Sequence, residues 1–542
     1  MTSINFSINL FASRSYLVIE DFGEMRNMIK GLLRTLGATN IDAARDAREA
    51  LAMIDRARYD VILCDYNLGS GKSGQQLLEE LRHRHLIDMS TVFVMITAEN
   101  TRDMVMAVVE YEPDSYLFKP FTKELLGTRL SKLFERKADL SPVFAMMRRL
   151  DYGKALELVE ERIARKPKNL AHLIRLKAEI CQLAGQHDDA RKIYEDLLNE
   201  REVPWARLGL GKVQFEQKAF TDAAENFDHL VQNHQTLMSA YDWLAKSQVA
   251  LGFARDAQTT LRHALRLSPH VMNRQQALGE LALQNQDFEL AESALSRAAE
   301  LSKHSIYNNP QLHANLAKSK SVVGKHEEAL QVAEGIGKLF DTPEASFYAT
   351  SAQAQIHKSR GDDAAAQACM QTAEETQRAM GKKAPPDMAL ELARTAAQLG
   401  KLEQAQQIMR NAIRNNHDND EFLSRATSVL RETGIGEDPT AMVHAIRLEV
   451  MEMNNEGVKL ISEGQIGKAI ELFTEAAESM TGNLAINLNA ARALLMKMEK
   501  DGAESSTLGM ARKYIERSKE IAPSDTRLNK VLKRYQKLVG AG

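Results

Sequence analysis

The stretch VILCDYNLGSG, residues 61–71, places the acidic residue Asp65 directly after four apolar residues and before a run of turn-forming residues. Four consecutive apolar residues match a short strand that is buried on both faces, which is typical of parallel sheets. The asparagine and glycines after the acid predict a loop. The stretch therefore predicts a buried strand whose carboxyl end carries a carboxylate.

Other short apolar runs recur between residues 15 and 137, and helix-like patterns separate them. Strands that alternate with helices predict βαβ units, in which helices cover both faces of a parallel sheet. We therefore predict an α/β domain with a five-stranded, doubly wound parallel sheet. Its predicted strands are residues 16–21, 38–44, 61–65, 91–97 and 115–118.

Polar residues stand at the carboxyl ends of these strands or directly after them, where binding sites form in doubly wound sheets. Three carboxylates at one edge repel each other, and a divalent cation would relieve that repulsion. Oxygen ligands with open positions for water suit Mg²⁺. Taken singly, each residue is equally compatible with a helix cap or an ordinary surface position. The residues are Glu20, Asp21, Asp65, Thr97, Lys119 and Pro120.

Over residues 15–137 this set and its spacing resemble the receiver domain of bacterial response regulators, which has a flavodoxin-like fold. The matching positions are Glu20, Asp21, Asp65, Thr97, Tyr116, Lys119 and Pro120. The resemblance implies that Asp65 accepts a phosphoryl group from a sensor histidine kinase or a phosphotransfer protein. It also implies that Mg²⁺ is held by Glu20, Asp21, Asp65 and the backbone carbonyl of Asn67.

The same resemblance also identifies the residues that would respond when Asp65 is phosphorylated. It implies that Thr97 and Lys119 hold phosphoryl oxygens, that Pro120 follows a cis peptide bond, and that Tyr116 turns inward after phosphorylation. The affected surface would include Met104, Val108, Tyr111 and the helix 122–137, although Met104 and Val108 also have the spacing of core residues. A receiver that folds but is never phosphorylated is the alternative interpretation.

A helical repeat begins near residue 141. Ala190, Ala223, Ala257 and Ala291 are 33, 34 and 34 residues apart, and each is followed four residues later by a bulky side chain. This period matches the helix-turn-helix unit of the tetratricopeptide repeat, abbreviated TPR. Such units stack into an all-α superhelical solenoid with a concave surface. We count about ten units.

The predicted organisation combines the receiver-like domain with this array. A short linker between them favours a receiver that packs on the array rather than one that swings freely. The predicted segments are an N-terminal extension (1–14), the receiver domain (15–137), a linker (138–142), a TPR array (143–412), an atypical helical segment or hinge (413–452), further TPR units (453–523) and a capping helix (524–542).

The repeats carry no recognisable catalytic or DNA-binding motif, and TPR arrays bind peptides or partner proteins. Residues 453–493 resemble the co-chaperone type of TPR that binds a C-terminal carboxylate. Asn489 matches one position of that clamp, whereas Asn454 and Val458 replace its lysine and asparagine. Asn454, Asn455 and Asn489 are candidate groove residues; the alternative is that they face solvent without a ligand.

The overall composition narrows the range of partners. The chain has 70 basic and 73 acidic residues, a formal charge of −3, which gives no global attraction to nucleic acids or anionic membranes. We find no apolar run long enough to cross a membrane and no signal peptide. Three widely spaced cysteines fit a reducing cytoplasm. A nucleic-acid partner and membrane insertion are not expected.

We therefore predict a two-component response regulator whose TPR output binds an unknown protein or peptide under the control of Asp65 phosphorylation. Both the exposure of the array and a homodimer contact are candidates for what phosphorylation changes. We expect no enzyme beyond weak autophosphorylation and autodephosphorylation. The alternatives are a constitutive TPR scaffold with a silent receiver, and an enzyme or nucleic-acid regulator hidden among the repeats.

Overall fold

The computed structural model describes residues 10–98 and 113–540, apart from residues 166, 168, 503 and 524. The chain divides into two compact units. The first comprises Met1–Asn285 with Ser293–Asn308, and the second comprises Gln286–Glu292 with Asn309–Gly542. Within the described residues, no helix combines the length and the apolar character that a membrane span requires.

The first unit opens with a five-stranded parallel sheet, as predicted. Its strands follow the order β2-β1-β3-β4-β5. Because the chain reverses direction across the sheet between β1 and β3, the ends of these two strands form the topological switch point. The strands are β1 (Ser15–Ile19), β2 (Asn40–Ala44), β3 (Val61–Asp65), β4 (Val92–Thr97) and β5 (Ser115–Phe118).

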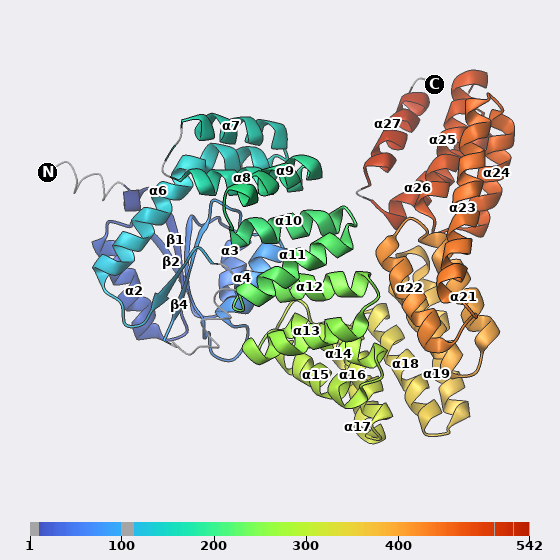
Figure 1. Ribbon diagram of the computed structural model, residues 1–542, viewed down its shortest axis with the longest axis horizontal. Helices are drawn as coiled ribbons and strands as arrows, with labels where there is room; N and C mark the ends of the chain where they lie inside the picture. Colours follow the sequence, from blue (N-terminus) through green and yellow to red (C-terminus); the bar gives the residue numbers. More distant parts are fainter. Residues whose placement is uncertain are drawn as a thin grey trace. The chain divides into compact units, whose positions relative to one another are not determined.

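Helices cover both faces of this sheet (Figure 1). Helices α2 (Gly23–Thr35) and α6 (Lys123–Arg148) pack on one face, where Leu33 and Phe134 join Val18 and Val94 in one core. Helices α3 (Ala47–Ile54) and α4 (Gly74–His83) pack on the other face, with Leu78 against a second core. Alternate strand residues point to opposite faces, so these continuous apolar strands fill both cores.

Helix α6 corrects the predicted linker at 138–142, because the helix continues through these residues to Arg148. A proline inside a helix costs about 3 kcal/mol, and Pro142 is such a residue. However, Leu140, Val143 and Phe144 are buried against the first repeat helices. Each such side chain contributes about 1.5–3 kcal/mol, so their burial outweighs the cost of the proline. The last helix of the sheet domain and the first helix of the repeats are therefore one helix.

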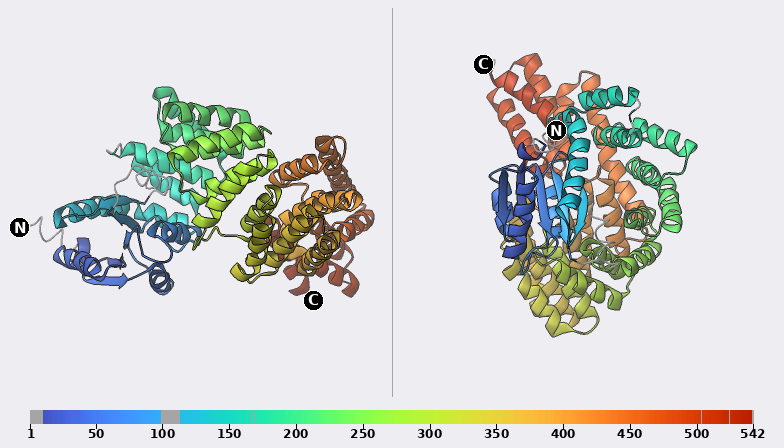
Figure 2. Two further views of the ribbon diagram at one scale, coloured as in Figure 1. Left: turned by 90° about the horizontal axis from the view of Figure 1, so that it is seen from below. Right: turned by 90° about the vertical axis from the view of Figure 1, so that its left-hand side faces the viewer.

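The repeats of the first unit are helices of 13 or 14 residues that follow one another in pairs (Figures 1 and 2). Small residues admit the bulky side chains of neighbouring helices: a Cβ added at Gly211 would lie 2.6 Å from the Phe227 ring. The helices are α7 (Tyr152–Ala164), α8 (Leu170–Leu183), α9 (His187–Glu200), α10 (Pro204–Glu216), α11 (Phe220–Asn233), α12 (Met238–Ala250), α13 (Ala254–Leu267) and α14 (Met272–Gln284), followed by α15 (Phe288–Leu301), whose first turn is assigned to the second unit.

The second unit continues the helical pattern. The atypical segment 413–452 is itself helical: it contains α22 and the beginning of α23, and Gly434 ends α22 with a left-handed φ of 67°. The helices are α16 (Pro310–Val322), α17 (His326–Leu339), α18 (Pro343–Ser359), α19 (Asp363–Met380), α20 (Pro386–Gln398), α21 (Leu402–Asn415), α22 (Asp420–Thr433), α23 (Pro439–Ser462), α24 (Ile466–Ser479), α25 (Leu484–Asp501), α26 (Ser505–Ile521) and α27 (Thr526–Gly540).

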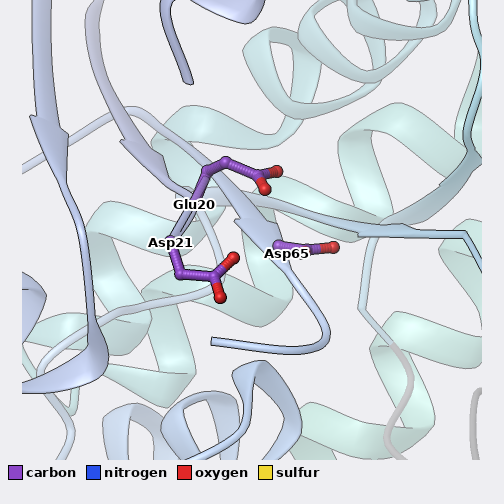
Figure 3. A group of neighbouring side chains, drawn as sticks. All are labelled: Glu20, Asp21 and Asp65. Carbon is purple, nitrogen blue, oxygen red and sulfur yellow. The ribbon is translucent and has the colours of Figure 1, made fainter. Parts of the chain in front are cut away.

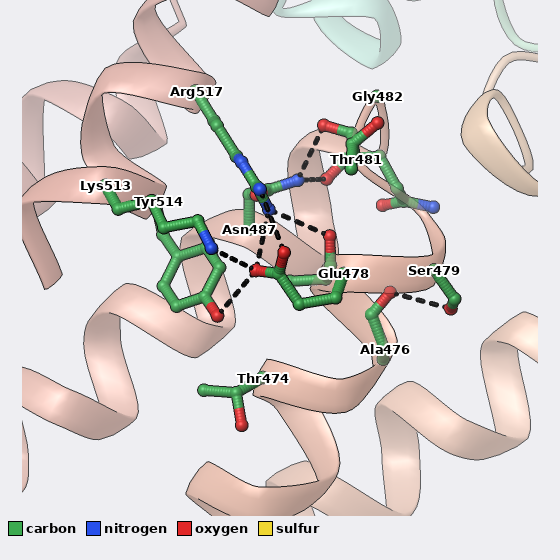
Figure 4. A network of polar contacts seen from close by, with 12 residues as sticks. Thr474, Ala476, Glu478, Ser479, Thr481, Gly482, Asn487, Lys513, Tyr514 and Arg517 are labelled. Atoms are coloured by element: carbon green, nitrogen blue, oxygen red, sulfur yellow. Dashed lines mark hydrogen bonds and ion pairs between the residues drawn. The ribbon is translucent and has the colours of Figure 1, made fainter. Parts of the chain in front are cut away.

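A polar network ties α24 to α26 (Figure 4). One carboxylate oxygen of Glu478 accepts hydrogen bonds from Lys513 at 2.8 Å, from the Tyr514 hydroxyl at 3.0 Å and from Arg517 at 3.0 Å. The hydrogen bond from Arg517 is the largest cause that lowers the pKa of Glu478, to about 2. Glu478 therefore stays ionised and links the two helices at neutral pH.

Candidate functional site

Three carboxylates meet where β1 and β3 end (Figure 3). Glu20 and Asp21 follow β1, and Asp65 is the last residue of β3. Because Ile19 pairs with Cys64, the residues after them lie side by side. Each carboxylate offers an oxygen within 4.8 Å of the other two. Glu20 and Asp65 are only 1% and 7% exposed, whereas Asp21 is exposed.

Lys119 brings a positive charge to this group from the end of β5. Its ammonium nitrogen lies 2.8 Å from Oε2 of Glu20 and 3.1 Å from Oδ2 of Asp65. The Lys119–Pro120 peptide bond is cis, as the resemblance to receiver domains implied. The Lys119 backbone N–H donates to the carbonyl of Thr97 at 2.8 Å, which fixes the lysine beside the end of β4.

The balance of charge sets the acidity of these groups. Burial is the main cause that raises the pKa of Asp65 to about 6, and the charge of Glu20 adds to it, although Lys119 acts in the opposite direction. Burial alone would lower the pKa of Lys119, but its hydrogen bond to Glu20 and the two carboxylate charges raise it. Lys119 is therefore charged at neutral pH, and its ammonium group pairs with two of the three carboxylates.

The loop after Asp65 is tightly folded. The backbone N–H of Tyr66 donates to Ile96 at 2.8 Å, and that of Gly74 donates to Tyr66 at 2.8 Å. A Cβ at Gly74 would lie 2.1 Å from the carbonyl oxygen of Asp65, so only glycine fits there. The side chain of Asn67 accepts a hydrogen bond from Gly69 within the turn. The loop thus brings the first residue of α4 back to the backbone of Asp65.

Two contributors to the site were missed in the sequence. Gly74 was one, although the capping pair Ser73 and Gln76 marks the start of α4 and could have pointed to it. Arg26 is the other: its guanidinium donates to the backbone carbonyls of Glu20 at 2.6 Å and Asp21 at 3.3 Å. No sequence pattern announces this contact, because it depends on how α2 folds back over the turn.

Comparison with known proteins agrees with this geometry. The profile of the response regulator receiver domain matches residues 16–131. The chemotaxis protein CheY of Pseudomonas aeruginosa is 37% identical over 120 residues, which are 22% of this chain and 95% of CheY. The chain belongs to the response regulator receiver family. CheY-3 of Vibrio cholerae is 36% identical over 120 residues, 22% of this chain and 91% of CheY-3.

Solved structures resemble separate parts of the chain. The CheY4 protein of Vibrio cholerae shows 28% identity and a TM-score of 0.21, covering 22% of this chain and 98% of CheY4. A tetratricopeptide repeat protein from Parabacteroides merdae shows 12% identity and a TM-score of 0.31, covering 44% of this chain and 92% of that protein.

The receiver family places the chain among two-component response regulators, and receiver domains bind Mg²⁺ at an acidic pocket. The residues present fit such an ion. Mg²⁺ takes oxygen ligands at about 2.1 Å in an octahedron, so its ligands lie roughly 3 to 4 Å apart. The oxygens of Glu20, Asp21 and Asp65 already lie within 4.8 Å of one another.

The remaining receiver positions have distinct environments. Thr97 ends β4 and is 2% exposed, one residue beyond Ile96, which pairs with Asp65. Tyr116 is half-buried on β5 and packs against the core beneath α3 and α4, and this burial raises its pKa. The other residues predicted for the switch surface, Met104, Val108 and Tyr111, lie outside the described residues.

The structure brings together two of the three candidate asparagines in the repeats. The side chain of Asn489 on α25 donates to the side-chain oxygen of Asn454 on α23 at 2.6 Å. Both residues line a groove of about 570 Å³. Asn455 is exposed on α23 and is not among the described residues that line this groove.

Proposed function

We propose that this response regulator is a phosphorylation-controlled adaptor. Asp65 accepts a phosphoryl group from the phosphohistidine of a sensor kinase or phosphotransfer protein, and the repeats then gain or lose a protein partner. The observation that carries the proposal is the position of Lys119, whose ammonium group bridges Glu20 and Asp65 at the switch point of the sheet.

The chemistry follows from these positions. An Asp65 oxygen attacks the phosphorus, so that a P–O bond forms while the P–N bond to histidine breaks and the electron pair returns to the imidazole. Transfer of this kind needs charge stabilisation more than covalent assistance. The ammonium of Lys119, 3.1 Å from Asp65, lies within reach of a phosphoryl oxygen, and the Thr97 hydroxyl offers a hydrogen bond.

Glu20, Asp21, Asp65 and the carbonyl of Asn67 would hold Mg²⁺ in this proposal. When bound, the ion would supply positive charge that offsets the excess of carboxylates at the rim. The proposal assigns Glu20 and Asp21 to metal binding, because their carboxylates lie with Asp65 in one group of possible metal ligands.

A route from the acceptor to the repeats runs through α4. The loop that returns to Asp65 leads directly into this helix. Gln76 in its first turn donates from Nε2 to the carbonyls of Leu301 at 3.3 Å and Lys303 at 3.1 Å. At the other end of α4, the His83 ring meets the Tyr307 ring edge to face with centroids 5.7 Å apart. The α4 contact, as we name these interactions with residues 301–307, lies within the first unit.

The α4 contact gives the proposal a physical link. A phosphoryl group on Asp65 adds bulk and charge beside the loop that positions the first turn of α4, which also carries Gln76. A small shift of that turn would change its hydrogen bonds to residues 301 and 303. We propose that this contact is one of the two-state elements that phosphorylation biases.

The test is the intact mass of the full chain after incubation with Mg²⁺ and a small phosphoryl donor. We expect one added phosphoryl group on the wild type and on Asp55→Asn, which changes an exposed receiver carboxylate, and none on Asp65→Asn. Uptake by Asp65→Asn at the wild-type rate would refute the acceptor assignment. Amide exchange of residues 301–309 should then change in the wild type and in Asp55→Asn but not in Asp65→Asn; unchanged exchange in the phosphorylated wild type would favour a scaffold with a silent receiver.

A further inference from the structure

A polar junction in the second unit joins two turns that are far apart in the sequence. One turn follows α21 and contains His417, and the other precedes α25 and contains Gly482 and Asn483. The Gly482 backbone N–H donates to the side-chain oxygen of Asn415 at 3.1 Å, and Nδ2 of Asn483 lies 2.9 Å from Nδ1 of His417. We call these four residues the 417–483 junction. It links helices of different apolar cores, because α21 and α22 contribute to one core and α24 and α25 to another.

The side-chain amide of Asn483 can adopt only one orientation at this junction. Asn483 is 1% exposed, and its side-chain oxygen caps α25 by accepting from the backbone N–H of Ile486 at 3.1 Å. Its Nδ2 donates to the backbone carbonyl of Arg414 at 2.7 Å. The reversed amide would set its oxygen against that carbonyl and its NH₂ group against the N–H of Ile486. The second hydrogen of Nδ2 is therefore the one that meets Nδ1 of His417.

This orientation determines the protonation state of the histidine. An amide N–H can donate to Nδ1 only when that nitrogen carries a lone pair, so His417 is neutral and holds its proton on Nε2. A second proton on the ring would place an N–H on Nδ1, directly opposite the N–H of Asn483. The hydrogen bond would be lost and replaced by a contact between two donors.

The surroundings of the ring also favour its neutral form. His417 is 7% exposed. Burial is the main cause that lowers its pKa; Asp418 opposes this effect, and Arg447 and Arg527 add to it. Arginine and carboxylate groups titrate outside pH 5–8, so among these described residues only His417 changes its charge in that range. The ion pairs next to the junction are Arg414–Glu449, Arg447–Asp420 and Arg527–Asp525.

We propose that the 417–483 junction is an acid-sensitive latch within the repeats, which opens when His417 takes up a proton from solvent. The protonated ring repels the Asn483 amide, and the turn before α25 is released from the turn after α21. Because the folded ring binds a proton less readily than an exposed histidine, whose pKa is about 6.5, the junction is at full strength above about pH 6.5 and weakens as the pH falls below that value. The latch needs no phosphoryl group on Asp65, so it is independent of the adaptor function.

The experiment measures amide hydrogen exchange of residues 480–487 in the full-length chain at pH 7.5 and pH 5.5. Wild type and His417→Asn are compared at the same pH, so that the intrinsic exchange rate cancels. We expect equal exchange at pH 7.5, because the asparagine oxygen can accept in place of Nδ1. At pH 5.5 the wild type should exchange at least about fivefold faster than the variant, the factor that one hydrogen bond contributes. The matched control is His444→Asn, which removes an exposed histidine of α23 and should respond as the wild type does.

A second variant reverses the expected response. In Asn483→Asp the carboxylate still caps α25, accepts from a protonated His417 and offers no N–H to the Arg414 carbonyl at pH 7.5. Residues 413–419 of this variant should therefore exchange more slowly, relative to their intrinsic rates, at pH 5.5 than at pH 7.5. If His417→Asn already exchanges faster than the wild type at pH 7.5, the asparagine does not replace the ring, and this reversal alone decides.

Three results would overturn the proposal. They are equal exchange of the wild type and a His417→Asn chain that matches it at pH 7.5 when both are measured at pH 5.5, loss of the acid response in His444→Asn, and an Asn483→Asp chain that opens on acidification as the wild type does. All measurements use unphosphorylated chain and are repeated with Asp65→Asn, which should keep the acid response. The latch and the phosphorylation-controlled adaptor can therefore fail separately.

Discussion

Two groups of charged side chains, one at the rim of the receiver sheet and one in the repeats, differ in their balance of charge. At the rim of the receiver sheet, the ammonium group of Lys119 pairs with Glu20 and Asp65, and Asp21 lies beside these two carboxylates. In the repeats, Lys318 donates to both oxygens of Glu391, at 3.0 and 2.9 Å. Arg394 donates to Glu391 at 2.8 Å and also pairs with Glu432. The first group has an excess of acid, whereas the second is neutral.

The different charge balances shift the pKa values of the two buried carboxylates in opposite directions. Burial raises the pKa of both Asp65 and Glu391, and the neighbouring charges decide the outcome. Asp65, beside Glu20, reaches about 6. For Glu391 the charges of Lys318 and Arg394 prevail and lower the pKa to about 2. In the neutral group the opposite charges compensate one another, whereas an acidic excess at a strand end favours the binding of a cation.

The largest loss of stability is expected from a substitution in the neutral group of the repeats. Glu391→Leu should destabilise the repeats by about 3–5 kcal/mol, because it leaves the buried ammonium of Lys318 without a counter-charge. The measurement is calorimetric unfolding of the full chain. The matched variant Lys318→Met with Glu391→Leu removes both charges and should recover most of the loss. Equal destabilisation in the single and double variants would mean that packing, and not the unpaired charge, carries the effect.

The pH dependence of the repeats follows from the same group. The folded-state pKa of Glu391, about 2, lies below the value of about 4.3 that glutamate has in an unfolded chain. Its contribution to stability is therefore complete above about pH 4.3 and is lost as the pH falls toward 2. Calorimetry across this range should show a shallower decline for Glu391→Gln than for the wild type. Identical declines would contradict the assignment.

The acidic group predicts a response to metal. Mg²⁺ at a hundredfold excess over its Kd should stabilise the receiver against unfolding by about 2.7 kcal/mol, because the ion binds the folded rim only. Asp21→Asn removes one of the three carboxylates and should lose most of this stabilisation, whereas Asp55→Asn should keep it. Thermal unfolding with and without Mg²⁺ checks the prediction. An equal shift in both variants would show that the ion acts elsewhere.

The sequence predicted the acidic group but not the neutral one, for a physical reason. Strand ends in a doubly wound sheet converge by topology, so Asp65 and Lys119 could be placed together from their positions along the strands. Glu391 lies between Leu390 and Leu392 on a repeat helix, and Lys318 is 73 residues away. Which helix faces complement each other depends on the stacking of three repeats, and the period alone does not specify that.

The repeat period likewise predicted helices but not every boundary. It identified the alanines that are fully buried, such as Ala190 and Ala257. The prediction of a linker at 138–142 was wrong. Pro142 favours a break in the helix, but the apolar spacing of Leu140, Val143 and Phe144 continues it. Local propensity suggested the linker, and tertiary packing overrides it.

The smallest expected effect comes from Glu478, and it separates acidity from stability. The pKa of Glu478 is about 2, as low as that of Glu391. However, the Glu478 side chain is 48% exposed, so water screens its pairs with Lys513 and Arg517. Glu478→Gln should therefore cost about 1 kcal/mol or less, and high salt should reduce the difference further, whereas the effect at Glu391 should persist in salt. Calorimetry at two ionic strengths checks both. A salt-resistant loss as large as that of Glu391→Leu would show that the lowered pKa, and not burial, measures what a carboxylate contributes to this fold.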